Sequence, residues 1–230
     1  AVDTADNNFV VFDSGNSSIR RDTWVTPDYT MGAITLDMNK QYVQVFDQNR
    51  AMGVFFSSGL NDRVMVFGKG AVTDDKSYAD LNGVCRTNCM VVQRDQNANA
   101  SGDGTLIFVP QGLWTNRVET GGWIFLQSGN AYCAIKPASG GYTAVAAEYG
   151  YDLELGDLWA PVIVQMGQAS GYADFAAFQS SVQSNALTYA SGVLNYTSEA
   201  AETFTAYANT KTTPRVNGVT VGLNPTKTYN

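Results

Sequence analysis

The chain of 230 residues contains no histidine. This absence excludes any Ser-His-Asp or Cys-His catalytic arrangement that is complete within the chain. Charged residues are also scarce, at 15% of the sequence, against about 25% in an average soluble domain. With 14 Lys and Arg against 21 Asp and Glu, the net charge is −7. The basic surface that nucleic acids require is therefore missing, and we expect no nucleic-acid partner.

Long apolar runs are absent too. No run approaches the roughly 18 residues that a transmembrane helix requires, so we expect no membrane partner. The first residues, AVDTADNNFVVFD, lack the basic and apolar regions of a signal peptide. If the protein is secreted, we expect its signal to have been removed or to lie upstream.

Only three cysteines are present, Cys85, Cys89 and Cys133. Without histidine they are too few for a zinc site, and we expect no metal held by cysteine. In an oxidising compartment the simplest interpretation is one disulfide plus a free thiol. Cys85 and Cys89 are close enough to close a tight loop, while Cys133 alternates with apolar residues and is expected to be a buried thiol. The alternative is three unpaired, buried thiols.

The residues that are abundant indicate a secreted, all-β protein. Aromatic residues make up 12% of the chain, and segments with period-2 alternation are separated by Gly-, Asn- and Asp-rich turns. We predict one large antiparallel β-sandwich, of supersandwich or jelly-roll type, over residues 1–230. The expected strands are 8–13, 29–36, 41–47, 52–58, 63–68, 105–110, 113–119, 122–128, 131–137, 142–149, 158–167, 203–208 and 215–222.

One segment changes period. Phe175, Phe178 and Val182 fall on one face of a helix, which predicts a single amphipathic helix around residues 171–185. Ser170 or Gly171 is expected to cap it, and Asp174 to complement its N-terminal dipole. Residues 70–104 carry the weakest strand signal and are expected to form a long excursion.

Three motifs have a functional and a neutral interpretation. The alternating oxygens of residues 95–103 resemble the start of a calcium loop, but Gly and the closing Glu are missing, so a solvated hairpin tip is preferred over calcium and no other cofactor is expected. Asn16, Asn99 and Asn195 begin glycosylation sequons. The carboxylates of residues 148–157 resemble an acid–nucleophile pair, yet their alternation fits a solvated strand equally well.

Two chemistries remain available without histidine. Exposed aromatic rings stack on sugars, and Trp114, Trp123 and Tyr142 are the candidates, with core packing as the alternative. A lyase can use Tyr as base and acid beside a cation that neutralises a uronic carboxylate, with Tyr132, Tyr142, Arg117 and Lys136 as weak candidates.

Four segments, TPDYTMGAI, QYVQVFDQNRAMGVFF, GGWIFLQSGNAYCAIKPASGGY and WAPVIVQMGQASGYADFAAFQSSV, carry a family resemblance. Over roughly residues 20–225 the chain resembles the C-terminal β-sandwich region of large secreted proteins related to heparinase II/III-type polysaccharide lyases. That resemblance implies a preceding (α/α) toroid that carries much of the catalytic machinery, on the same or a companion chain. The family often has a histidine in the strand corresponding to 41–47, which here reads QYVQVFD.

Three hypotheses follow from these features. The first is an accessory, mainly structural β-sandwich of a secreted carbohydrate-active enzyme, part of a larger protein, which lines or supports a polysaccharide groove. The second is a free-standing polysaccharide lyase that uses Tyr and Arg on the concave sheet face. The third is a non-catalytic surface structural protein. For the isolated chain we expect no cleavage of glycosidic bonds.

Overall fold

The computed structural model describes residues 8–12, 19–36, 52–59, 61–69, 76–77, 81–94, 104–147, 150–208 and 210–223. These residues form three antiparallel sheets, one α-helix and one 3-10 helix. The predicted all-β sandwich with one principal helix is therefore confirmed. The expected strand 41–47 lies outside the described residues.

Sheet A is the largest, with the spatial order β1-β2-β3-β4-β5-β9-β14-β13 and β6 beside β5. Its strands are β1 (Asn8–Phe12), β2 (Ile19–Val25), β3 (Tyr29–Leu36), β4 (Met52–Phe56), β5 (Arg63–Lys69), β6 (Lys76–Ser77), β9 (Gly104–Pro110), β13 (Tyr142–Ala147) and β14 (Gly150–Leu155).

Sheets B and C are smaller. Sheet B has the order β10-β11-β12-β15-β8-β7, and sheet C runs β16-β17-β18-β19-β20. The strands of sheet B are β7 (Leu81–Arg86), β8 (Cys89–Arg94), β10 (Asn116–Thr120), β11 (Trp123–Ser128), β12 (Ala131–Pro137) and β15 (Val162–Gln168). Those of sheet C are β16 (Leu187–Ala190), β17 (Val193–Thr197), β18 (Thr203–Tyr207), β19 (Arg215–Val216) and β20 (Val219–Thr220).

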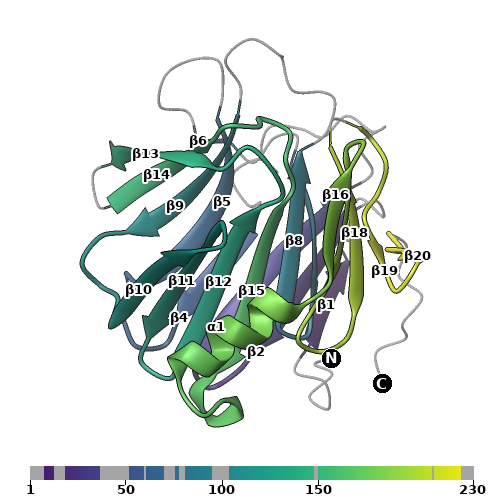
Figure 1. Cartoon of the computed structure of the whole chain (residues 1–230). Helices are drawn as coiled ribbons and strands as arrows, with labels where there is room; N and C mark the ends of the chain where they lie inside the picture. Colours follow the sequence, from purple (N-terminus) through teal and green to yellow (C-terminus); the bar gives the residue numbers. More distant parts are fainter. Residues whose placement is uncertain are drawn as a thin grey trace.

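The three sheets are arranged in layers, with sheet B in the middle (Figure 1). Alternate side chains of its strands point to opposite faces, because successive residues of a β-strand do so. Ile124, Cys133 and Val164 face sheet A and join Met31, Val54 and Ile107 there in a mainly aliphatic cluster, called core AB below. Burial of this cluster removes apolar surface from water and holds the two larger sheets together.

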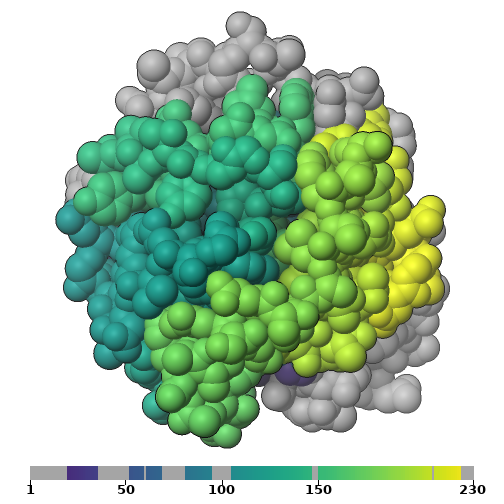
Figure 2. Space-filling view, viewed as in Figure 1, coloured from purple at the N-terminus to yellow at the C-terminus, as the bar shows by residue number. Residues whose placement is uncertain are grey.

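The other face of sheet B is covered by the helix α1 (Phe175–Ser184) and by sheet C, which lie side by side over it in Figures 1 and 2. The cluster between them, called core BC, includes Trp123, Phe125, Tyr132, Phe178, Tyr196 and Phe204. Within it the Phe178 ring lies 5.5 Å from that of Tyr132 and 6.1 Å from that of Phe125.

Two buried glutamines of sheet B form hydrogen bonds with sheet C and with the segments that adjoin its strands. The Gln165 Oε1 accepts from Glu199 N and from the Tyr196 hydroxyl, each at 3.2 Å. The Gln93 Oε1 accepts from Tyr207 N at 3.0 Å, and its Nε2 donates to Thr212 O at 2.8 Å. These contacts satisfy polar groups that would otherwise be buried without partners, so they set how sheet C sits on sheet B.

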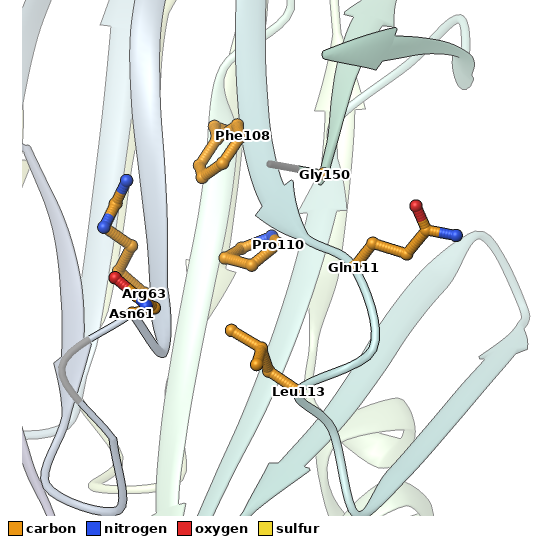
Figure 3. Close-up of a pocket in the computed structure, with 7 residues that line it drawn as sticks. All are labelled: Asn61, Arg63, Phe108, Pro110, Gln111, Leu113 and Gly150. Carbon is orange, nitrogen blue, oxygen red and sulfur yellow. The ribbon is translucent and has the colours of Figure 1, made fainter. Parts of the chain in front are cut away.

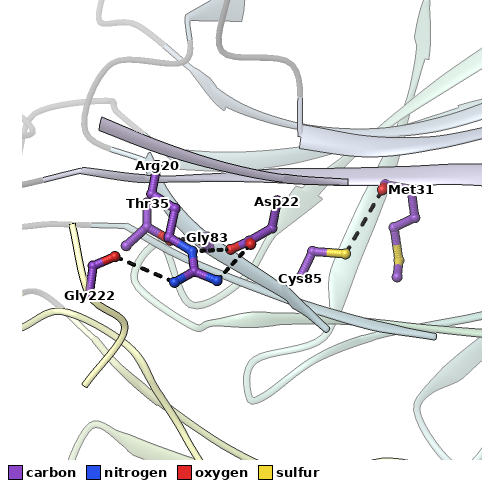
Figure 4. Close-up of polar contacts among 7 residues, drawn as sticks. All are labelled: Arg20, Asp22, Met31, Thr35, Gly83, Cys85 and Gly222. Carbon is purple, nitrogen blue, oxygen red and sulfur yellow. Dashed lines mark hydrogen bonds and ion pairs between the residues drawn. The ribbon is translucent and has the colours of Figure 1, made fainter. Parts of the chain in front are cut away.

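Polar contacts also join β3 to β7, and an ion pair lies within β2 (Figure 4). Arg20 and Asp22 form a two-pronged ion pair with both N···O distances at 2.8 Å, and the Asp22 side chain is only 1% exposed. The Thr35 hydroxyl donates to Gly83 O at 2.6 Å, which links sheet A directly to sheet B. Arg20 also donates to Gly222 O at 3.5 Å.

The helix begins one residue after Asp174, whose carboxylate accepts from Ala177 N at 2.7 Å. The N-cap is therefore Asp174 and not Ser170 or Gly171, which lie in the 3-10 helix Ala169–Gly171. Phe178 and Val182 are buried, as the helical periodicity predicts. In the described ranges no helix has the length and apolar character to cross a membrane.

The three cysteines are free, buried thiols, so the expected Cys85–Cys89 disulfide is wrong. Cys85 pairs with Met90 and Arg86 with Cys89 across the β7–β8 hairpin, which places the two cysteines at adjacent register positions. Their side chains consequently point to opposite faces, Cys85 into core AB and Cys89 into core BC. Cys133 is the buried thiol that the alternation predicts, and burial raises the pKa of all three thiols.

The expectation of a long excursion over 70–104 is wrong at its centre. Residues 81–94 form the hairpin of β7 and β8, both in the middle layer. Nearly every residue of the hairpin is buried, so the segment shows no apolar–polar alternation.

Candidate functional site

Trp123 and Tyr132, two of the residues selected from the sequence, are core residues. Each is only 5% exposed, and both rings lie in core BC. Tyr132 is surrounded by the rings of Tyr172, Phe175 and Phe178. Neither side chain is placed to stack on a sugar or to reach a substrate proton.

Trp114 has a positioning role. Its indole Nε1–H donates to Pro110 O at 2.8 Å, and its ring meets that of Phe56 edge-on at 5.3 Å. These contacts fix the loop between β9 and β10 against core AB.

Arg117 and Tyr142 meet across the edges of sheets B and A, through Glu119. The Arg117 Nη2 lies 2.6 Å from Glu119 Oε1, and the Tyr142 hydroxyl donates to Glu119 Oε2. Burial and the Glu119 carboxylate raise the pKa of Tyr142 to about 12. A catalytic base needs the opposite shift, so Tyr142 stays protonated near neutral pH.

Lys136 is not part of that cluster. Its Nζ donates to Gly121 O at 2.6 Å and lies 5.4 Å from the centre of the Trp123 ring. Burial lowers its pKa. The structure thus brings together Arg117 and Tyr142 of the four catalytic candidates and leaves Lys136 and Tyr132 elsewhere.

The remaining expected sites are the glycosylation sequons and the calcium-like stretch, and only Asn195 among them is described by the structure. Asn195 is exposed on β17, and its Oδ1 accepts from the Thr205 hydroxyl at 2.9 Å. Asn16, Asn99 and the calcium-like stretch 95–103 lie outside the described residues. In the described part of the chain, no group of three or more metal-binding side chains is present.

A groove elsewhere in the fold is the stronger candidate for a binding site. A groove of about 570 Å³ opens where the three sheets and both helices meet, and we call it the three-sheet groove. Its lining residues are Trp24, Tyr29, Thr87, Asn88, Gly167, Gln168, Ser170, Gly171, Tyr172, Ser181 and Glu199.

The turn TWVTPDYT forms the sheet A wall of the groove. The Thr26 Oγ1 accepts from Asp28 N at 3.2 Å and from Tyr29 N at 3.0 Å, which closes the turn. Tyr29 is 2% exposed and anchors the turn in core AB. The Asp28 carboxylate in turn accepts from Gln168 Nε2 at 2.7 Å, which fixes this wall against β15.

Glu199 forms the opposite wall. Its carboxylate accepts from Tyr172 OH at 3.0 Å, from Ser181 Oγ at 2.6 Å and from Asn185 Nδ2 at 2.6 Å. Burial, together with the nearby Glu199 charge, raises the pKa of Tyr172. Tyr172 is therefore a hydrogen-bonding phenol at neutral pH.

Backbone strain and an unsatisfied polar atom occur side by side in the groove. Thr87, in the β7–β8 turn, has φ +47°, a left-handed conformation that β-branched residues rarely adopt. The Oδ1 of Asn88, the next residue, is buried and has no hydrogen-bond partner. Strained backbone and unsatisfied polar groups are both concentrated at functional sites.

Gly167 lets the aromatic wall approach the floor of the groove. A Cβ at this position would lie 2.8 Å from Tyr172 Cε2 and 2.9 Å from the Phe178 ring. The glycine therefore allows the Tyr172 ring to lie directly on β15.

The groove combines aromatic faces with hydroxyl, amide and carboxylate groups, and its described lining contains no Lys or Arg. Such a set accepts hydrogen bonds from sugar hydroxyls and offers ring faces for stacking. Apart from Ser170 and Gly171, which were expected to cap the helix, the sequence analysis did not single out these residues. The pair Thr87-Asn88, which lies between two apolar runs, is a turn signal in the sequence and could have indicated one wall of the groove.

No family model, no curated protein and no solved structure matches this chain. What is established is therefore the architecture, a mostly β protein built from antiparallel sheets.

Proposed function

We propose that this chain is a sugar-binding, non-catalytic β-sandwich module of a secreted carbohydrate-active enzyme, and that it holds polysaccharide in the three-sheet groove. The observation that carries the proposal is the groove itself, where the rings of Trp24 and Tyr172 line the same space as the polar side chains of Asn88, Gln168 and Glu199. Sugar binding needs this combination of aromatic rings and hydrogen-bonding groups.

The groove favours a neutral sugar. Glu199 lines it, Asp28 lies at its edge, and neither is offset by a cation among the described lining residues. Carboxylates accept hydrogen bonds from hydroxyl groups but repel other carboxylates.

The resemblance to the β-sandwich of heparinase II/III-like proteins supports the accessory role of the module, but not the choice of a neutral sugar, because such lyases act on uronic acids. Under this proposal the module works beside a catalytic (α/α) domain of the same or a companion chain and guides polymer towards it. The low charge content and the abundance of turn residues and aromatic residues agree with secretion.

A test of binding uses the whole chain in calorimetric titrations with a panel of neutral oligosaccharides. We expect at least one to bind, and Trp24→Ala and Gln168→Ala to weaken that binding about tenfold, equivalent to about 1.4 kcal/mol. Trp159→Ala is the matched control, since Trp159 is a partly exposed tryptophan outside the groove. Trp24→Phe retains most of the packing and separates a binding defect from a folding defect.

Two outcomes would overturn this proposal. Binding that Trp24→Ala and Gln168→Ala leave unchanged would place the sugar elsewhere. An absence of binding across the panel, with folded protein, would favour a surface structural protein.

A free-standing lyase is the second candidate, and the contact of Arg117 and Tyr142 with Glu119 is the observation that favours it. The raised pKa of Tyr142, about 12, opposes it. Absorbance near 235 nm, which reports unsaturated uronide, should stay flat when the chain is mixed with acidic polysaccharides. A rise that Tyr142→Phe abolishes would establish the lyase instead.

A further inference from the structure

A second pocket lies on the outer face of sheet A, away from core AB (Figure 3). It has a volume of about 640 Å³ and is lined by Asn61, Arg63, Phe108, Pro110, Gln111, Leu113 and Gly150. We call it the Arg63 pocket. Small-molecule sites have volumes of about 300–1,000 Å³, so it is large enough for a ring-sized ligand and not only for an ion.

Strand alternation explains which side chains reach it. Val64 and Val109 point into core AB, so their neighbours Arg63, Phe108 and Pro110 point to the opposite face. Figure 3 shows Asn61 and Arg63 on one side, with Phe108, Pro110 and Leu113 between them and Gln111. A cation thus stands beside an apolar surface, with an amide at each side.

Arg63 carries the only positive charge of the described lining, and that charge is not neutralised by an acid. Its guanidinium lies 5.4 Å from the centre of the Phe108 ring, which orients it. Arg20 and Arg117 are both paired with carboxylates, whereas Arg63 has no ion pair within the described ranges. Its five N–H donors are suited to binding a carboxylate in two-pronged geometry.

Two acids that adjoin the pocket, one in sequence and one in strand register, form no ion pair with Arg63 within the described ranges. Asp62, the preceding residue, is 8% exposed and accepts from Ser128 Oγ at 2.5 Å and from Ser58 Oγ at 3.0 Å. Asp152 is opposite Phe108 in the β14–β9 pairing and faces the same side of sheet A, but it makes another interaction and is not a lining residue.

The apolar wall is held in place before any ligand arrives. The Trp114 indole donates to Pro110 O at 2.8 Å, which fixes the loop that carries Leu113. Gly150 lets β14 approach this wall, because a Cβ there would lie 2.4 Å from Val109 O and 2.6 Å from Pro110 Cα. A wall that is already ordered loses little entropy on binding.

We infer that the Arg63 pocket binds a carboxylate attached to a six-membered ring. Arg63 holds the carboxylate, and the ring lies against Leu113, the exposed apolar side chain of the described lining, since Phe108 (5% exposed) and Pro110 are buried. A uronic acid and an aromatic acid share this chemistry. The site is separate from the three-sheet groove, and this inference does not rest on the function proposed for the groove.

The test is a titration of the whole chain with glucuronate, benzoate and glucose, followed by the Arg Nε–Hε signals in ¹H–¹⁵N spectra. At least one of the two carboxylates should shift the Arg63 signal, and the stronger of the two identifies the source, while glucose should leave the signal in place. Arg63→Gln should weaken carboxylate binding at least tenfold, and Arg63→Lys should weaken it less. Arg117→Gln, which removes an equal charge outside the pocket, is the control and should leave the affinity unchanged.

Equal affinity of Arg63→Gln and the unchanged protein for both carboxylates would overturn the inference, as would a failure of both to bind. Trp24→Ala separates the two proposals. If it abolishes carboxylate binding while Arg63→Gln does not, the carboxylate binds in the groove, so the Arg63 inference fails and so does the preference of the groove for a neutral sugar. Loss of carboxylate binding in Arg63→Gln alone supports the Arg63 pocket and leaves the groove proposal to its own test.

Discussion

The two faces of sheet B are packed by different chemistry, although the same strands supply both. Core AB is mainly aliphatic, and Tyr29 and Phe56 are the only aromatic residues among its 25 described buried members. Core BC has six aromatic residues among 15 described buried members. Two large sheets pack closely with branched aliphatic side chains, whereas a helix and a small sheet leave a less regular gap that large rings fill.

The polar contacts differ in the same way. Gln93 and Gln165 both face core BC. Gln93 forms hydrogen bonds with Tyr207 and Thr212. Gln165 forms hydrogen bonds with Tyr196 and Glu199. The groove residues Tyr172 and Glu199 lie on this side too, next to Ser181 of α1. The aliphatic face therefore mainly provides stability, while the aromatic face also fixes the geometry of the candidate site.

Among the tests of the two cores, truncation of Phe178 should cause the largest loss in the free energy of unfolding. Its side chain is fully buried, and its ring contacts those of Phe125, Tyr132, Tyr172 and Phe175. Phe178→Ala should lower the free energy of unfolding by about 3–5 kcal/mol, measured by urea denaturation. Phe55→Ala, at an exposed phenylalanine of β4 (47%), should cost about 1 kcal/mol or less. Equal losses for the two variants would contradict the layered core.

Removal of Gln165 tests the polar side of core BC. Gln165→Ala leaves the Tyr196 hydroxyl and Glu199 N without their acceptor, so we expect a loss of about 2–4 kcal/mol in the free energy of unfolding. The matched control is Gln183→Ala on the exposed face of α1, which should change stability by about 0.5 kcal/mol or less. A loss no greater than that of the control would show that Gln165 does not hold sheet C.

Thr87 is a case in which substitution should stabilise the fold. A non-glycine residue in the left-handed region costs about 1–2 kcal/mol, and Thr87 has φ +47°. Thr87→Gly should therefore raise the free energy of unfolding by about 0.5–1 kcal/mol after the entropy cost of glycine. Thr188→Gly, on exposed β16, should instead destabilise by about 1 kcal/mol. A loss of stability in Thr87→Gly would mean that the strain is absent.

Substitution of Glu119 should have the smallest effect on stability, and the size of that effect depends on pH. The hydrogen bond from Tyr142, followed by that from Arg117, lowers the pKa of Glu119 in the folded state. Its stabilising contribution is therefore present above the unfolded pKa of about 4.3 and is lost as pH falls through the lower folded value.

Because the Glu119 side chain is 46% exposed, solvent screening reduces this contribution to about 0.3 kcal/mol. Glu119→Gln should be less stable than the unchanged protein by that amount at pH 7 and equal to it near pH 2. Stability differences that do not change between the two pH values would count against the contact.

Sequence alternation predicted most strands that have one buried and one solvated face. It missed β7 and β8, where burial on both faces places the polar residues Asn82, Gln93 and Arg94 in the interior and removes the alternation. It also missed β14, β16 and β17, although these strands do alternate.

Sequence alternation missed β2 as well, because three consecutive charged residues, Arg20, Arg21 and Asp22, are unusual in a strand. In the structure Arg20 and Asp22 form a largely buried ion pair. The helix was found because Phe178 and Val182 share a face that only a helical period aligns.

The candidate sites could not be predicted in the same way. The three-sheet groove joins Trp24, Asn88 and Glu199, which come from three sheets and have no shared sequence pattern. The Arg63 pocket could not be predicted, because the sequence does not show whether Arg63 pairs with an acid. The answer depends on where the side chains of Asp62 and Asp152 point in the folded chain. Trp123 and Tyr132 were selected by residue type, but burial decides whether a ring can meet a ligand.

The glutamine contacts have a consequence for hydrogen exchange. Sheet C is joined to sheet B by side chains and not by a shared backbone ladder, whereas β12 lies between β11 and β15 in the middle layer. Strands flanked and covered on both sides exchange their amide protons only when the whole domain opens, and units held by side chains open at lower free energy. We therefore expect the amide protons of sheet C to exchange faster than those of β12, with the Glu199 wall of the groove opening while the sandwich of sheets A and B remains folded.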